Sequence, residues 1–166
     1  MNFDKRTIKK ISTNRKRLEK ELNIKLEIKG NSVDISGNEL EIYVAEKVFQ
    51  AIEKNFPVNT ALLLTSEDYM LESISIKSIS KRKNISQIKA RIIGTKGKTL
   101  KLLSELSECH IALHNNIVSI IGTFEKIKIA ESAIKNLIKG SKQANVYFYL
   151  EKHKKNIIPE DLGIKH

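Results

Sequence analysis

The chain has 166 residues and a mass of 18.9 kDa, which allows one ordinary domain or two small ones. Its 30 lysines and arginines outnumber 19 acidic residues, and the formal net charge of +11 favours a polyanionic partner, either nucleic acid or an anionic membrane surface. A single cysteine excludes an internal disulfide framework, and no apolar run approaches the roughly 20 residues that a membrane span needs. We therefore expect a soluble protein of the cytoplasm with no membrane contact and no cofactor.

The sequence contains two copies of one small unit. When it is shifted by 85 positions, residues 16–46 align with residues 101–131 without a gap, and the apolar positions stay in step. The identical pairs include Lys16 and Lys101, Leu18 and Leu103, Asn31 and Asn116, Val33 and Val118, Ile35 and Ile120, Gly37 and Gly122, Ala45 and Ala130, and Glu46 and Glu131. We expect two domains, at 1–58 and 66–140, followed by a C-terminal helical extension over 141–166.

The second copy predicts the element order β-α-α-β-β-α. Alternating polarity indicates a strand over 70–79, and apolar spacings of three and four indicate a helix over 83–93. Leu100, Leu103 and Leu106 predict a second, short helix. A hairpin turning at Asn115 and Asn116 and an amphipathic helix over 124–138 complete the unit.

The first copy predicts the same order with one strand missing. Its hairpin over 24–36 turns at Gly30 and Asn31, and its long helix over 39–55 is stopped by Pro57. The counterpart of the strand at 70–79 would lie before Met1. We expect this copy either to lack that strand or to take an equivalent from elsewhere, and the link over 57–67 to form a packed helical turn.

A glycine pair separates the two short helices of the second copy. Because Gly94 and Gly97 lack a Cβ atom, the main chain can approach a phosphodiester closely, and the following helix adds exposed N–H groups and a partial positive charge. Lys96 and Lys98 add full positive charges. On these four residues alone, a helix-turn-helix corner in which Gly97 only turns the chain is the alternative.

The charge around this loop favours the phosphate-binding interpretation. From Ser73 to Ser104 the chain has nine lysines and arginines and no acid, whereas a solvated face normally mixes the two signs. The cations are Lys77, Lys81, Arg82, Lys83, Lys89, Arg91, Lys96, Lys98 and Lys101.

The extended pattern resembles a KH domain. It reads Ile92-Ile93-Gly94-Thr95-Lys96-Gly97-Lys98-Thr99-Leu100-Lys101-x-Leu103, then Ile111-x-Leu113 and Val118-x-Ile120-x-Gly122. In KH domains a GxxG loop clamps the backbone of about four single-stranded nucleotides. Both hairpin strands follow the loop, as in the type I version, so the expected fold is an α/β (α+β) chain of two tandem type I KH-like domains. One departure is Glu108, which stands where the family usually has glycine.

The resemblance implies a set of RNA-binding residues. Single-stranded RNA would lie against Gly94, Thr95, Lys96 and Gly97, and Lys96, Lys98 and Lys101 would contact phosphates. Arg91 would flank the groove, and Ile92, Ile93 and Ile111 would form its floor.

The two-copy arrangement indicates one particular group of KH-domain proteins. Together with the ending Gly140-x-x-x-x-x-Val146-Tyr147-x-x-Leu150-Glu151, it resembles the archaeal and eukaryotic KH-repeat proteins of small-subunit ribosome assembly, the partner-of-Nob-one family. The resemblance implies a non-enzymatic factor that binds single-stranded rRNA near the 3′ end of the small-subunit precursor. It also implies cooperation with a PIN-domain rRNA endonuclease and with other assembly factors. A generic KH-type mRNA-binding or single-stranded DNA-binding protein, and a basic adaptor that docks an acidic protein, are the alternatives.

The first copy has no glycine at the positions that align with the loop. Lys9-Lys10-Ile11-Ser12 stand there, with further basic residues on either side. This region is expected either to touch RNA through side chains or to serve only as a structural support.

No metal site or catalytic constellation is predicted. Cys109 and His110 would point to opposite faces of a strand, and Cys109 aligns with the apolar Ile24, which favours a core thiol. The acidic pair Glu67-Asp68 is expected to be a solvated helix edge.

Overall fold

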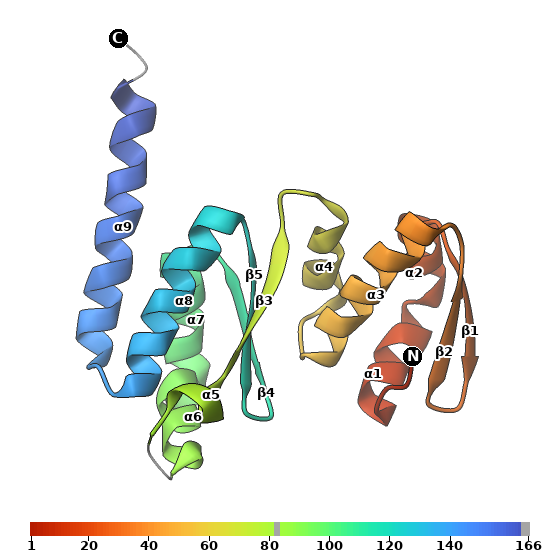
Figure 1. The fold of residues 1–166 in the computed structure, drawn as a ribbon, viewed down its shortest axis with the longest axis horizontal. Coiled ribbons are helices and arrows are strands. Elements are labelled where there is room, and N and C mark those ends of the chain that lie inside the picture. The colour runs from red at the N-terminus through yellow and green to blue at the C-terminus, as the bar shows by residue number, and fades with distance from the viewer. Residues whose placement is uncertain (82–83, 164–166) are drawn as a thin grey trace. The chain divides into compact units, whose positions relative to one another are not determined.

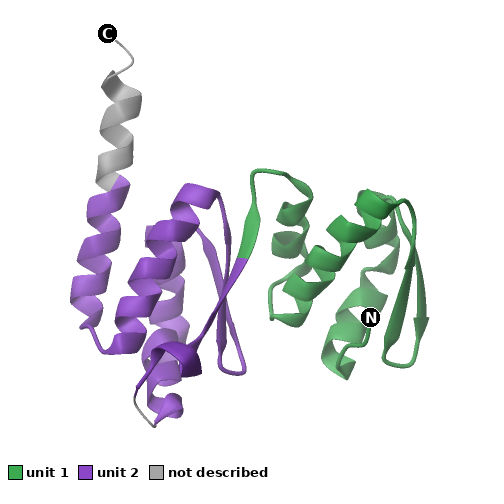
Figure 2. Cartoon of the chain, in the orientation of Figure 1, with its two compact units in different colours: residues 1–71 green, residues 72–166 purple. Residues whose placement is uncertain are grey.

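The computed structural model describes residues 1–81 and 84–163, with side chains through residue 154. The chain divides into two compact units, Met1–Leu71 and Glu72–His166 (Figure 2). The structural boundary lies after residue 71. The domain limits expected from the sequence, 1–58 and 66–140 with an extension over 141–166, stay predictions.

Unit 1 combines a two-stranded antiparallel hairpin with helices. Its elements are α1 (Lys5–Thr13), α2 (Arg15–Leu22), β1 (Lys25–Lys29), β2 (Ser32–Ser36), α3 (Glu39–Glu53), α4 (Val58–Ala61) and the 3-10 turn η1 (Leu62–Thr65) (Figure 1). The hairpin turns where the sequence predicts, and its register places Leu26 opposite Ile35. The link before residue 67 is helical, as expected, and packs on α3 within unit 1.

Helix α3 begins at a capping box. The Asn38 side chain accepts a hydrogen bond from the Glu41 N–H at 2.8 Å, and the Glu41 carboxylate accepts one from the Asn38 N–H at 3.2 Å. These two bonds satisfy main-chain donors that have no partner inside the helix. The helix buries Phe49 and Ile52 in the unit 1 core, where the Phe3 ring meets the Phe49 ring edge-on at 6.4 Å.

The strand expected to be missing from unit 1 has a short equivalent. Met1–Phe3 run beside β2: the Val33 N–H donates to the Met1 carbonyl at 2.8 Å, and the Phe3 N–H donates to the Asn31 carbonyl at 2.9 Å. Asn2 and Ser32 form an isolated antiparallel bridge. As expected, the structure has no full strand before α1, and Met1–Phe3 supply a short equivalent beside β2.

The junction of the first two helices also differs from the expected alignment. Lys9-Lys10-Ile11-Ser12 lie inside α1, which continues to Thr13, and only Asn14 separates it from α2. The Asn14 side chain donates to the Lys10 carbonyl at 2.8 Å, which closes the end of α1. The constant shift of 85 positions thus holds from α2 onward and fails before it, because the Gly94–Gly97 loop of the second copy has no counterpart here.

Unit 2 contains a three-stranded sheet in the order β3-β5-β4. The last elements of the chain are β3 (Met70–Ser75), α5 (Ile76–Ile79), α6 (Ile85–Ile93), the 3-10 turn η2 (Thr95–Gly97), α7 (Lys98–Ser107), β4 (His110–His114), β5 (Ile117–Gly122), α8 (Phe124–Lys139) and α9 (Gln143–Gly163) (Figure 1). The predicted order β-α-α-β-β-α is confirmed. The strand expected over 70–79 ends at Ser75, where a helical turn buries Ile76; residue 83, the predicted start of the next helix, lies outside the described residues.

One hydrophobic core holds unit 2 together. Helices α6, α7 and α8 lie on one side of the sheet in Figure 1. Ile92, Leu103 and Ile134 of these helices belong to the same buried cluster as Ile120 of β5. Helix α9 joins this core through Val146 and Leu150 and packs on α7 and α8. The loop between α6 and α7 is therefore held in place on both sides, because each of these helices buries its apolar face in the core.

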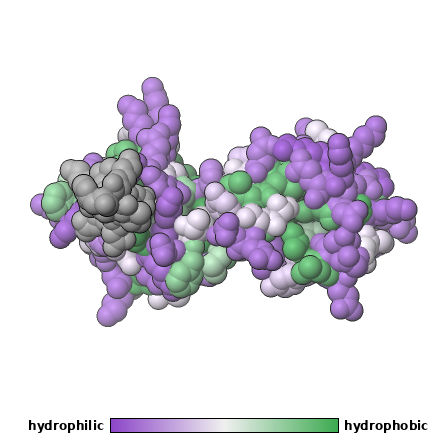
Figure 3. All heavy atoms as spheres, turned by 90° about the horizontal axis from the view of Figure 1, so that it is seen from above, coloured by the Kyte–Doolittle hydropathy of each residue, from purple (hydrophilic) through white to green (hydrophobic). Residues whose placement is uncertain are grey.

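The face of the chain seen in Figure 3 is mainly hydrophilic. Figure 3, which shows one face, is dominated by polar side chains with smaller apolar areas among them. Among the described residues, none of the helices has the length and apolar character needed to cross a membrane.

Candidate nucleic-acid interface

The loop between α6 and α7 is a tight turn in which Gly94, Lys96 and Gly97 all have positive φ, and the last two lie in the left-handed helical region. Lys96 has φ 55° and ψ 30°, and Gly97 has φ 74° and ψ 12°. The Gly97 N–H donates to the Gly94 carbonyl at 3.2 Å, which closes the turn. An L-residue such as Lys96 adopts this conformation only at a cost, so its surroundings must hold the loop in shape.

The two glycines are required for different reasons. A Cβ atom at Gly94 would lie 2.1 Å from Oγ1 of Thr99 and 2.8 Å from the Thr99 nitrogen, so this position has no room for a side chain. A Cβ atom at Gly97 would meet nothing within 4 Å. Gly94 therefore packs the loop against α7, whereas Gly97 leaves its main chain open to solvent and to an approaching ligand.

Helix α7 presents an uncapped N-terminus at this open side. It begins at Lys98, and its N-cap residue, Gly97, has no side chain that could accept hydrogen bonds from the first N–H groups. These donors, with the positive end of the helix dipole, suit an anionic oxygen such as that of a phosphate.

Three exposed lysines surround the open main chain. Lys96, Lys98 and Lys101 form no ion pair with any described residue. Their ammonium groups are thus available to an outside anion. The structure brings these three cations and the loop predicted from sequence together on one short segment.

Of the other five predicted residues, Thr95 is exposed in the loop itself, and four lie differently. The Arg91 guanidinium donates to the carbonyls of Leu137 at 3.3 Å and Ser141 at 2.6 Å, so it is engaged with the protein instead of flanking an open groove. Ile92 has none of its surface exposed, so it supports the loop from the core and does not form a groove floor. Ile111 is buried, whereas Ile93, with 36% of its surface exposed, is the one of the three isoleucines that a ligand can reach.

Sequence reasoning did not assign a role to Thr99 or to Gln143. Thr99 is buried under Gly94, and the Gln143 side chain, at the start of α9, donates to the Arg91 carbonyl at 3.0 Å and to Oγ1 of Thr99 at 3.4 Å. The Gln143 bonds span 44 and 52 positions of the sequence, so no local pattern could have indicated them.

Unit 1 offers no comparable site at the equivalent place. Its first two helices meet at Asn14 with no glycine loop, so the main chain has no open turn there. Two arginines of α2 form ion pairs one turn along the helix, Arg15 with Glu19 at 3.0 Å and Arg17 with Glu21 at 3.1 Å. The geometry therefore makes the two units unequal as ligand sites.

Cys109, the candidate metal ligand, lies in the core of unit 2. Burial raises the pKa of the Cys109 thiol to about 11, so it stays protonated at neutral pH. Within residues 1–81 and 84–163, no group of three or more histidine, cysteine or acidic side chains is placed to hold a metal ion. The pair Glu67-Asp68 is exposed in a turn, as expected.

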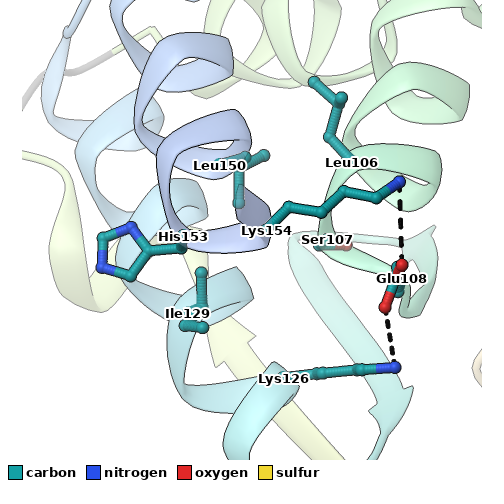
Figure 4. Close-up of a pocket in the computed structure, with 8 residues that line it drawn as sticks. All are labelled: Leu106, Ser107, Glu108, Lys126, Ile129, Leu150, His153 and Lys154. Carbon is teal, nitrogen blue, oxygen red and sulfur yellow. Dashed lines mark ion pairs between the residues drawn. The ribbon is translucent and has the colours of Figure 1, made fainter. Parts of the chain in front are cut away.

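A small pocket of unit 2 is lined by Glu108 and its two lysine partners. Figure 4 shows Glu108 between two lysines, with Lys126 at 2.7 Å and Lys154 at 3.6 Å. The cavity beside them has a volume of about 10 Å³, which is close to the space of one water molecule. Glu108 has φ 55°, the left-handed conformation that glycine adopts easily, and its two ion pairs are the interactions that a glycine there would lack.

Comparison with known proteins agrees with this geometry. The family model described as the eukaryotic type KH-domain (KH-domain type I), from the second such domain of PNO1, matches residues 70–155, just over half of the chain. This match spans the sheet of unit 2, the glycine loop and the start of α9.

The sequence similarity to known proteins extends over both units. A KH domain-containing protein of Methanocaldococcus jannaschii is 33% identical over 86% of this chain and 66% of its own length. The pre-rRNA-processing protein pno1 of Aspergillus fumigatus is 29% identical over 79% of this chain and 56% of its own. The chain thus spans between about half and two thirds of the length of these curated relatives.

A solved structure has the same fold over nearly its whole length. In the crystal structure of the a/eIF2alpha–aDim2p–rRNA complex from Pyrococcus horikoshii, one chain is 29% identical and aligns with a TM-score of 0.83. The alignment covers 94% of this chain and 93% of that one. With a β-α-α-β-β-α unit, a GxxG loop and a family model that matches both, this chain belongs to the PNO1 family of type I KH-domain proteins.

Proposed function

We propose that this protein is a non-enzymatic factor of pre-rRNA processing that binds single-stranded RNA through unit 2. The observation that carries the proposal is the Gly94–Gly97 loop: an open main chain and an uncapped helix N-terminus, with Lys96, Lys98 and Lys101 beside them. The names of the relatives, a pre-rRNA-processing protein and a chain in a complex with rRNA, support the same class of RNA.

The loop suits a single strand better than a duplex. A short turn with one open glycine can follow one phosphodiester backbone, and a neighbouring apolar side chain, Ile93, can contact bases that are splayed out of a stack. Paired bases in a duplex are not presented to such a surface. We therefore place the bound RNA segment in an unpaired end or loop of its parent molecule.

A more specific proposal concerns the segment of rRNA that is bound and the protein partners. We infer that the RNA is the 3′ end of the small-subunit rRNA precursor, which is the target that the partner-of-Nob-one resemblance implies. A PIN-domain endonuclease that cuts near this end, and further assembly factors, would then act beside the bound protein.

The test is a titration of one RNA across several salt concentrations, first single-stranded and then annealed to its complement. Three lysines that each neutralise one phosphate of a single strand give a slope of log affinity against log salt of about −2, since each contributes about 0.7. We expect the duplex to compete poorly. Tighter binding to the duplex with a steeper slope would leave only nonspecific attraction to a protein of charge +11.

The RNA that co-purifies with the protein separates the remaining alternatives. Enrichment of precursor rRNA that includes the 3′ end supports the proposal. A broad mixture of mRNA would favour a generic KH-type binder, and an acidic protein without RNA would favour the adaptor function.

A further inference from the structure

Three segments that are distant in the sequence meet behind the Gly94–Gly97 loop. They are the last turn of α6, the first turn of α7 and the short connection between α8 and α9. Two polar side chains, those of Arg91 and Gln143, make the contacts between them. Neither side chain belongs to the open surface that the proposed function uses.

Arg91 connects α6 to the end of α8 through hydrogen bonds. Helix α8 ends at Lys139, and the Gly140 N–H donates to the Leu137 carbonyl at 3.2 Å, which leaves that oxygen room for a second donor. The Arg91 guanidinium donates to the Leu137 carbonyl at 3.3 Å and to the Ser141 carbonyl at 2.6 Å. A cation at this end also meets the negative pole of the helix dipole. The connection before α9 is thereby held against α6.

Gln143 joins the two ends of the loop. Helix α6 ends at Ile93, so the Arg91 carbonyl has no intrahelical donor, and the Gln143 amide supplies one at 3.0 Å. The same amide nitrogen lies 3.4 Å from Oγ1 of Thr99, in the first turn of α7. Thr99 is also the residue that packs under Gly94. One side chain of α9 thus links the helix before the loop to the helix after it.

We propose that Gln143 is a positioning residue that holds the loop in its RNA-binding conformation, and that Arg91 secures the connection from which Gln143 acts. This inference rests on the proposed function. The loop keeps Lys96 in a left-handed conformation that a lysine adopts at a cost. Without the Gln143 bonds, other loop conformations gain population, and the apparent affinity falls in proportion to the fraction of molecules that remain competent.

The main test is Gln143→Met in the full chain, because methionine keeps the length and apolar stem of glutamine but has no donor. We expect the dissociation constant for single-stranded RNA to rise about three- to tenfold, the effect of losing one or two hydrogen bonds. The salt slope should stay at the wild-type value, since every lysine remains. Lys96→Gln, in contrast, should reduce the slope by about 0.7. Gln87→Met, the same change at an exposed position of α6, is the control and should bind as the wild type does.

Two further variants and one measurement without RNA make the test independent of a single substitution. Thr99→Val removes Oγ1 but keeps the shape of the side chain, so affinity should fall less than in Gln143→Met. Arg91→Lys keeps the charge but cannot reproduce the forked contact with two carbonyls, so affinity should fall at an unchanged salt slope. Amide hydrogen exchange at Lys96, Gly97 and Lys98 should be faster in free Gln143→Met than in the free wild type.

Several results would overturn the inference. Wild-type affinity and wild-type amide exchange in Gln143→Met would show that the bonds do not hold the loop. A flatter salt slope in Arg91→Gln, which removes the positive charge, would show that Arg91 contacts the RNA backbone directly. If the wild-type protein itself does not prefer single-stranded RNA, the proposed function fails, and amide exchange alone then decides whether Gln143 orders the loop.

Discussion

Gly94 packs so closely on Thr99 that a Cβ atom at position 94 would lie 2.1 Å from the threonine hydroxyl oxygen. The main-chain nitrogen of Thr99 would be 2.8 Å away, so rotation of the threonine side chain alone cannot make room. The first glycine of the loop is therefore a packing residue, and the second is the one that faces outward.

This relationship predicts a large effect of Gly94→Ala on stability. We expect the free energy of unfolding to fall by about 1–3 kcal/mol, the usual range for inserting atoms into a packed site. Urea denaturation measures it. Adding Thr99→Ala should restore only a small part of the loss, because it removes the hydroxyl oxygen but keeps the Thr99 Cβ atom and nitrogen, which would lie at 2.6 and 2.8 Å. An unchanged urea midpoint for Gly94→Ala would contradict the packing.

Gly97 allows the charge of the loop to be tested with little change in packing. Asn and Asp both tolerate the left-handed region, and a Cβ atom there meets nothing within 4 Å. Gly97→Asp should weaken binding of single-stranded RNA at least tenfold, about 1.4 kcal/mol. Gly97→Asn, its neutral counterpart, should weaken binding clearly less. Equal affinities for the two variants in a filter-binding assay would argue against a phosphate at this place.

The two units should respond unequally to the same kind of change. Lys9 and Ser12 are exposed on α1 and are not part of an open loop. We expect Lys9→Asp with Ser12→Asp to cost less RNA affinity than Gly97→Asp, although it removes more positive charge. The measurement is a side-by-side titration at one salt concentration. A larger loss from the unit 1 variant would identify α1 as the main binding surface.

Acid should weaken the junction of α7, α8 and α9. The hydrogen bond from Lys126 lowers the pKa of Glu108 below its ordinary value of 4.5, with the charge of Lys154 acting in the same direction and burial opposing them. Ionised Glu108 therefore stabilises the fold above pH 4.5, and this contribution is lost as the pH falls through the lowered folded-state pKa. The effect is small, because the side chain is 41% exposed.

The matching variant is Glu108→Gln, compared with the wild type in urea unfolding from pH 3 to pH 7. The wild type should be the more stable protein at pH 7, and the difference should shrink toward the acidic end. A difference that stays constant with pH would show that the ionised carboxylate contributes nothing to the unfolding free energy.

Local patterns in the sequence were sufficient to predict most elements of the fold. Both hairpins, with turns at Gly30-Asn31 and Asn115-Asn116, and the order β-α-α-β-β-α follow from alternation and helical spacing, which neighbouring residues determine. The loop cations were predicted for the same reason, since glycine spacing and charge are visible in a short stretch. The errors arose where the repeat was extended by analogy: the aligned loop positions of unit 1 fall inside α1, because a helix without glycine simply continues.

What the sequence determined by itself was therefore the type of each element and the chemical character of the loop, because both depend on residues within a few positions of one another. The tertiary structure alone decided which polar groups are free to bind. Arg91 looks like a phosphate-binding cation in the sequence, but the end of α8, 46 positions later, supplies carbonyls that engage it. Gln143 carries no local signal, yet packing of α9 brings its amide to both ends of the loop. Buried main-chain groups must find partners wherever the fold places them, and those partners are set by packing across the whole unit.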